Sequence, residues 1–138
     1  MNHYSYHSHT ADVIMKVRAE SLNELFETAM RGTGNLLKNN FCKQTAASSI
    51  EKKIVVHSVD LIALLIDFLS EVLLNSHIDK TIYCNLNIVK LTDREIEATI
   101  SGSSVEYFDE DIKAVTYHEA DVFKQKNNQW EASIIFDI

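Results

Sequence analysis

The feature that most constrains this fold is a long segment, residues 59–76, that is apolar on most of its helical faces. A helix with apolar side chains nearly all round must be covered by other elements on several sides. We therefore predict a central buried helix with Ser58 or Asp60 near its N-cap. Asp67 and Glu71, four residues apart on one face, are interpreted as its solvent-exposed stripe. The apolar positions are Leu61, Ile62, Leu64, Leu65, Ile66, Phe68, Leu69, Val72 and Leu73.

Segments with a period of two surround this helix, and such alternation is typical of half-buried strands. A second helical pattern begins at Ser21-Leu22-Asn23-Glu24, which has the form of a capping box, and continues to Leu37. Residues 39–49 are expected to form a loop. Two main helices packed on a mostly antiparallel sheet of about six strands give a single α+β domain over residues 1–138. Strands are predicted at 13–19, 50–57, 82–88, 95–100, 113–124 and 130–137, with Asn127-Asn128 as a hairpin turn.

Composition excludes several classes of function. The formal net charge is −7 at pH 7, whereas affinity for nucleic acid depends largely on Lys and Arg at the phosphates. We therefore expect no direct binding to nucleic acid. The chain contains three glycines and neither of the glycine-rich phosphate-binding motifs. No nucleophile–base pair is identified, so the sequence does not predict an ordinary nucleotide enzyme.

The two cysteines, Cys42 and Cys84, belong to no CxxC or Cys/His pattern, which argues against structural zinc. We expect two buried free thiols, with a single disulfide as the alternative. The first residues contain no apolar signal segment. The longest uninterrupted apolar run, residues 61–66, is far shorter than the ~20 residues that cross a bilayer. A cytoplasmic protein without a membrane partner is expected.

Carboxylates stand at the ends of two predicted strands. Asp12 precedes the strand at 13–19, and Asp137 is followed by Ile138, so a side-chain carboxylate and a terminal carboxylate are neighbours. Alternation up to Phe136 indicates that this end is held in the sheet. If Asp12 folds against it, three anionic groups meet, and they repel one another unless a cation lies between them. Oxygen ligands suit calcium, magnesium or manganese. The alternative is that Asp12 only shapes the turn before its strand.

Five segments, taken in order along nearly the whole chain, resemble the archease family. The stretch Lys113-Ala114-Val115-Thr116-Tyr117-His118 and the aspartate at the end are the most specific parts. The five segments are His9–Asp12 (HTAD), Ser21–Phe26 (SLNELF), Asp60–Leu65 (DLIALL), Lys113–Glu119 (KAVTYHE) and Trp130–Ile138.

Archeases are small accessory proteins of the RtcB-class RNA ligase, which joins tRNA halves after intron removal. The resemblance implies a non-enzymatic activator that promotes guanylylation and multiple turnover of that ligase in tRNA splicing. It also implies a bound divalent cation, calcium first, with magnesium or manganese as alternatives. The implied ligands are Asp12, Asp137 and Ile138 through its terminal carboxylate.

Other polar residues near these segments have two interpretations each. His9, Lys113 and His118 could support the metal ligands or contact the partner. Either histidine equally fits a half-buried residue with one hydrogen bond, and we favour that state for His118 in mid-strand. His3 and His7 are expected to lie in a mobile N-terminus.

The rival function is a stand-alone metal-dependent hydrolase in which His118 or His9 transfers a proton. A general chaperone is disfavoured because no Met-rich or extended apolar segment is found.

Overall fold

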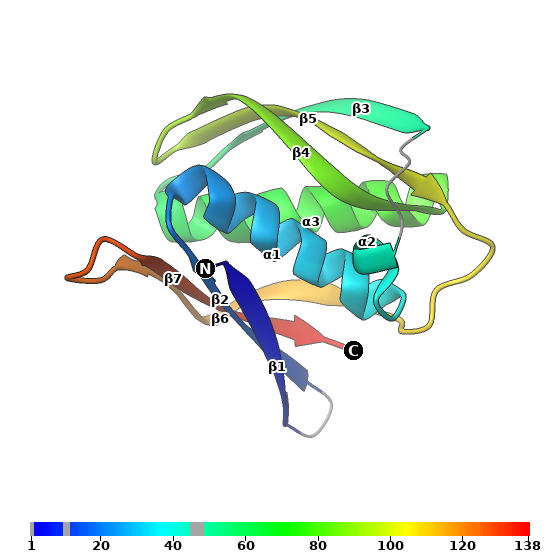
Figure 1. Cartoon of the computed structure of the whole chain (residues 1–138), viewed down its shortest axis with the longest axis horizontal. Coiled ribbons are helices and arrows are strands. Elements are labelled where there is room, and N and C mark those ends of the chain that lie inside the picture. The colour runs from blue at the N-terminus through cyan, green and yellow to red at the C-terminus, as the bar shows by residue number, and fades with distance from the viewer. Residues whose placement is uncertain (1, 10–11, 45–48) are drawn as a thin grey trace.

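Two helices lie between two antiparallel sheets in this computed structural model, which describes residues 2–9, 12–44 and 49–138 (Figure 1). The layers follow from the sequence, since an apolar helix needs cover on more than one side. In chain order the elements are β1 (His3–His9), β2 (Asp12–Ala19), α1 (Leu22–Leu37), α2 (Phe41–Gln44), β3 (Ile50–His57), α3 (Leu61–Asp79), β4 (Thr81–Leu91), β5 (Glu95–Ser104), β6 (Ala114–Lys124) and β7 (Trp130–Asp137).

The α+β class is confirmed, and the strands divide between two sheets rather than one. Sheet A has the order β1-β2-β7-β6, and sheet B has the order β3-β5-β4. Every neighbouring pair is antiparallel. One face of each sheet packs on the helices, while the other face of sheet A carries the candidate site. The predicted hairpin between β6 and β7 is present, with Asn128 in the left-handed region at φ 68°.

Helix α3 is the buried central helix that the sequence predicts. The side chain of Asp60 caps it by accepting the Ala63 N–H at 2.8 Å. Leu65 and Phe68 are fully buried, and Leu64, Ile66, Leu69, Val72 and Leu73 are buried with them, whereas Leu74 and Ile78 are exposed. By length and composition α3 could also cross a membrane, but half of that stretch is buried inside the protein. Its apolar character is therefore accounted for by its place between the sheets.

Helix α1 begins with the predicted capping box. The Ser21 Oγ accepts the Glu24 N–H at 3.1 Å and donates to Glu24 Oε1 at 2.9 Å. The first of these bonds satisfies one backbone donor that the first turn leaves unpaired, and the second joins the two side chains of the box. Further along, Phe26 packs on Phe68 of α3 with ring centroids 5.4 Å apart. The two helices thus share one core with both sheets.

The N-terminal segment corrects the sequence-based expectation of a mobile end. Residues 3–9 form β1, which pairs with β2 along its length, from His3 opposite Arg18 to His9 opposite Asp12. The strand is also held by helix α1, because the Tyr6 hydroxyl donates to the Gly32 carbonyl at 2.6 Å. The predicted loop at 39–49 contains the short helix α2, and its residues 45–48 lie outside the described part.

The cysteines correct a second expectation. Cys42 and Cys84 form a disulfide between α2 and β4 rather than remaining free thiols. The Arg31 guanidinium donates to the carbonyl oxygens of both residues, at 2.6 Å for Cys42 and 2.9 Å for Cys84. A covalent link and a charged side chain therefore join the same two segments. Spacing along the sequence gives no sign of this pairing, because 42 positions separate the two residues.

Candidate functional site

The candidate site lies at the end of sheet A where β2 begins and β7 ends. Asp12 and Asp137 are direct cross-strand partners. Residues directly opposite each other in an antiparallel pair project from the same face. The next pair, Val13 and Phe136, is buried in the core, so the two aspartates belong to the open face of the sheet. Two like charges placed in this way disfavour the strand pairing unless something neutralises them.

The end of β7 is held in place by its neighbours. The Lys113 N–H donates to the Asp137 carbonyl at 2.7 Å, and the Ile138 side chain packs against the core. The sequence-based expectation of a pinned rather than frayed end is therefore confirmed.

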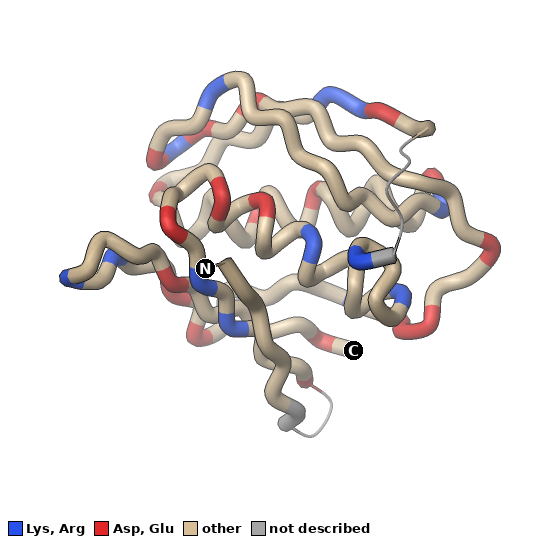
Figure 2. The backbone as a smooth tube through the Cα atoms, in the orientation of Figure 1, with Lys and Arg blue, Asp and Glu red and all other residues tan. Residues whose placement is uncertain are grey.

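No counter-charge within the described part of the chain pairs with these carboxylates. The ion pairs found there involve other acidic residues, and neither Asp12 nor Asp137 takes part. Acidic positions are spread over both sheets and their connections rather than gathered on one face (Figure 2). The site is therefore distinguished by the register of two strands, which brings two half-buried carboxylates together, and not by local charge density.

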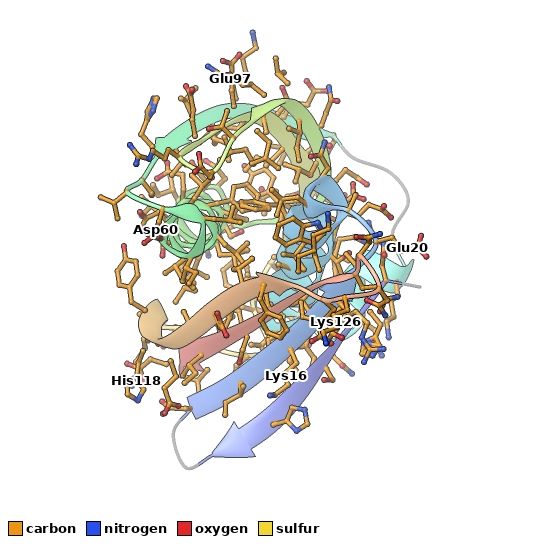
Figure 3. The ribbon with its side chains drawn as sticks, turned by 90° about the vertical axis from the view of Figure 1, so that its left-hand side faces the viewer. Lys16, Glu20, Asp60, Glu97, His118 and Lys126 are labelled. Atoms are coloured by element: carbon orange, nitrogen blue, oxygen red, sulfur yellow. A yellow bond between two sulfur atoms is a disulfide. The ribbon has the colours of Figure 1, made fainter. Side chains whose placement is uncertain are left out.

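A bulge in β6 brings further polar groups to the same place. The β6–β7 register moves from Thr116 opposite Ile135 to Asp121 opposite Ser133, so residues 117–120 face a single β7 residue. Bulges of this kind redirect side chains and are common beside functional sites. Figure 3 shows His118 on the side of sheet A away from α3. A cavity of about 320 Å³ is lined by Asp12, Ile14, His118, Glu119 and Ile135.

The predicted supporting residues, His9, Lys113 and His118, do not all lie at the same cavity. His118 lines the cavity with Asp12 but is exposed, not half-buried as the sequence suggests. The backbone of His9 pairs with Asp12, and its side chain is outside the described part. Lys113 lines a separate cavity of about 260 Å³ next to α3, beside Leu74 and other α3 residues.

Two residues around the site were missed by sequence reasoning. Glu119 lines the cavity, although nothing in the local pattern singles it out. Asp67 is not simply a solvent-exposed residue, because it accepts hydrogen bonds from Tyr117 and Ser58. Tyr117 lies 50 positions away in the sequence, so helical periodicity cannot reveal this contact.

The donors present suit a hard divalent cation. Within the described residues, no group of three or more His, Cys, Asp and Glu side chains is arranged to hold a metal. The predicted ligands include only two such side chains, those of two aspartates, and the third predicted ligand is a terminal carboxylate. All of its donors are oxygens, which calcium, magnesium and manganese prefer. Three protein groups are fewer than the 6–8 ligands of calcium, so water or a partner would complete the shell.

Comparison with known proteins places this chain in a family. A family model described as the Archease protein family (MTH1598/TM1083) matches residues 4–138. The chain belongs to the archease family. Similar proteins include the archease of Methanosarcina mazei, which is 29% identical over 98% of this chain and 95% of that protein. The archease of Pyrococcus furiosus is 26% identical over the whole of both chains.

Solved structures agree with the archease fold. The solution structure of Methanobacterium thermoautotrophicum protein 1598 matches with a TM-score of 0.78, covers 98% of each chain and is 20% identical. A crystal structure of an archease from Thermotoga maritima, described as a possible chaperone, matches with a TM-score of 0.58 at 18% identity and covers 96% of this chain and 94% of that one. At these identities the similarity establishes the fold alone.

Proposed function

We propose that this protein is a non-catalytic activator of an RtcB-class RNA ligase that promotes guanylylation and multiple turnover of the ligase in tRNA splicing. Membership of the archease family supports the accessory role. The observation that carries the mechanism is the direct pairing of Asp12 with Asp137 on the open face of sheet A. This role goes with a cytoplasmic location, with no membrane partner, and with contact to the ligase rather than to RNA.

The residues at this end of the sheet would hold a divalent cation. Asp12 and Asp137 would each supply a side-chain carboxylate, and Ile138 would supply its terminal carboxylate. Calcium is the first candidate, and magnesium and manganese are the alternatives. When bound, such a cation supplies a Lewis acid for phosphoryl oxygens. His118, at the cavity, would support the ligands, while Lys113, exposed beside α3, would contact the partner.

The position of the site suits presentation of the cation to another protein. It lies on an exposed sheet face, and its three carboxylates leave several coordination positions unfilled. A group of the ligase could complete the shell, which would couple binding of the two proteins to cation binding. The chain itself needs no nucleotide pocket for this role. Its described cavities contain no glycine-rich phosphate loop.

Guanylylation of the ligase with labelled GTP tests this proposal. We expect the native protein to accelerate both the first and later turnovers, and Asp12→Ala to abolish the effect. Loss of Asp12 should change stability by no more than the ~1 kcal/mol of a turn or cap contact. Asp121→Ala is the matched control, since Asp121 is an exposed aspartate on β6 of the same sheet and does not line the cavity. No acceleration by the native protein in either regime would refute the role.

A hydrolase remains the second candidate because one cavity joins Asp12 to His118 and Glu119. In that case His118 would transfer the proton between water and the leaving group. The purified protein alone would then hydrolyse a nucleotide or RNA in the presence of a divalent cation, and both Asp12→Ala and His118→Ala would lose this activity. Activity that survives either substitution would exclude this mechanism.

A further inference from the structure

We propose that Asp67 is a positioning residue for the candidate site. By accepting hydrogen bonds from Tyr117 and Ser58 it fixes the β6 bulge, residues 117–120, and so places His118 and Glu119 beside Asp12. The functional consequence rests on the proposed cation site at Asp12. The structural claim stands on the contacts of α3 with β6.

The Asp67 carboxylate connects three parts of the molecule. Its Oδ1 accepts the hydroxyl of Tyr117 in sheet A, and its Oδ2 accepts the hydroxyl of Ser58, which follows β3. Ser58 is itself anchored, because its N–H donates at 2.9 Å to the carbonyl of Arg94 in the turn that joins β4 and β5 of sheet B. Each oxygen of this α3 carboxylate therefore has a donor on a different element. The bulge is tied through α3 to the frame of the opposite sheet.

Strand alternation explains why a contact on one face controls the other. Successive residues of a strand project to opposite faces. Tyr117 reaches α3, and the next residue, His118, lines the cavity on the open face with Asp12. A hydrogen bond that fixes Tyr117 thus also fixes the backbone from which His118 projects.

The bulge needs such a constraint. Because residues 117–120 of β6 face a single residue of β7, the bulge disrupts the backbone hydrogen bonds between the two strands. Within it Glu119 adopts φ 52°, which is unusual for a residue other than glycine. Conformations of this kind persist where the surroundings enforce them. Burial contributes little here, since the Tyr117 side chain is 62% exposed. The hydrogen bond to Asp67 also raises the pKa of Tyr117, so the phenol remains a donor.

Two substitutions separate this role from a general effect on folding. Tyr117→Phe keeps the ring and removes only the hydroxyl. Asp67→Ala removes both acceptor oxygens and improves helix propensity. Tyr107→Phe is the matched control, because Tyr107 is 64% exposed and Lys38 lies over its ring at 3.9 Å, a contact that phenylalanine retains.

The experiment combines amide hydrogen exchange with manganese binding measured by electron paramagnetic resonance. In both variants we expect exchange at residues 117–121 to accelerate by about tenfold, the effect of losing one hydrogen bond of ordinary net strength. Manganese affinity should fall by about tenfold, the lower end of the range for loss of a group that supports metal ligands, because Asp67 acts on the site only through the bulge. In Tyr117→Phe the thermal midpoint and the exchange elsewhere should match those of Tyr107→Phe, whereas Asp67→Ala should also accelerate exchange around Ser58, because it removes the acceptor of that hydroxyl.

Unchanged exchange at 117–121 in both variants would overturn the positioning role. Accelerated exchange with native manganese affinity would overturn its connection to the site. If the native protein binds no manganese while exchange accelerates in the variants, the proposed cation site fails and Asp67 still positions the bulge. If Asp67→Ala does not fold, Tyr117→Phe alone decides between these results.

Discussion

The carboxylate at the end of α3 and the carboxylates at the end of sheet A are in opposite situations. Asp79 accepts the Tyr83 hydroxyl at 2.6 Å and the Lys52 ammonium at 2.9 Å. The hydrogen bond from Tyr83, and then Lys52, lower the pKa of Asp79. Asp12 and Asp137 share one sheet face and have no such cation within the described residues. The difference indicates that Asp79 stabilises the fold, whereas the directly opposed sheet A pair is expected to reduce stability when no ligand neutralises it.

The surroundings of Asp79 and of the sheet A pair differ in the same way, because only those of Asp79 contain additional stabilising links. Near Asp79, sheet B is tied to the helical layer by the Cys42–Cys84 disulfide and by the Arg31 hydrogen bonds. At the end of sheet A the described contacts hold the backbone in place and leave the carboxylates available. We therefore expect substitutions in the first region to change stability and substitutions in the second to change binding.

The largest expected effect on stability is that of removing the disulfide. Its loop spans 42 positions, and chain entropy alone gives a loss of about 4 kcal/mol in the free energy of unfolding for Cys42→Ala/Cys84→Ala. Urea denaturation measures this loss, and reduction of the native protein by a thiol should reproduce it. Cation affinity should not change, because the site lies in the other sheet. A loss below about 1 kcal/mol would show that the Arg31 contacts suffice.

Asp79→Asn should have a smaller effect, about 1 kcal/mol at neutral pH, because one charged partner of Lys52 and Tyr83 is lost at a partly exposed position. The lowered pKa sets the pH dependence. The contribution of Asp79 is complete above the ordinary aspartate pKa of about 3.9 and is lost as pH falls through the lower native value. Unfolding measured from pH 7 downward should therefore show the difference between native and variant closing in acid. A difference that does not depend on pH would contradict this assignment.

The smallest expected effect has the opposite sign. Without cation, Asp137→Asn should stabilise the protein by about 0.5 kcal/mol, because it removes repulsion between directly opposed like charges. With cation, the native protein should gain thermal stability that the variant lacks. Asp121→Asn, at an exposed position of β6, should be as stable as the native protein without cation and should gain the same thermal stability with cation. Destabilisation of Asp137→Asn like that of Asp79→Asn would mean that Asp137 has a structural partner instead.

Sequence patterns predicted the features that depend on local periodicity. The capping box at Ser21, the buried helix and the pinned end of β7 are all found. The strand β1 was missed because Tyr4 and Tyr6 are its only two large apolar side chains, too few to establish a period of two. The division into two sheets was missed because periodicity does not say which strands pair.

The carboxylates of the candidate site could be picked out from the sequence, but their surroundings could not. Asp12 and Asp137 stand at strand ends, and the resemblance to archeases singled them out. The disulfide and the contact between Asp67 and Tyr117 join residues 42 and 50 positions apart, so only the folded structure reveals them. The same holds for the bulge that brings Glu119 to the cavity, because bulge position depends on the partner strand.

Calorimetric titration of calcium and manganese tests the central claim that paired carboxylates at the end of sheet A bind a cation. The proteins to compare are the native form, Asp137→Asn, and a form extended by a few residues beyond Ile138. The extension converts a carboxylate into an amide and leaves the Ile138 side chain in place, so the shell loses one negative charge, on which calcium affinity depends. Our prediction is one site in the native protein and substantially weaker binding in both altered forms. Equal affinities for all three would contradict it.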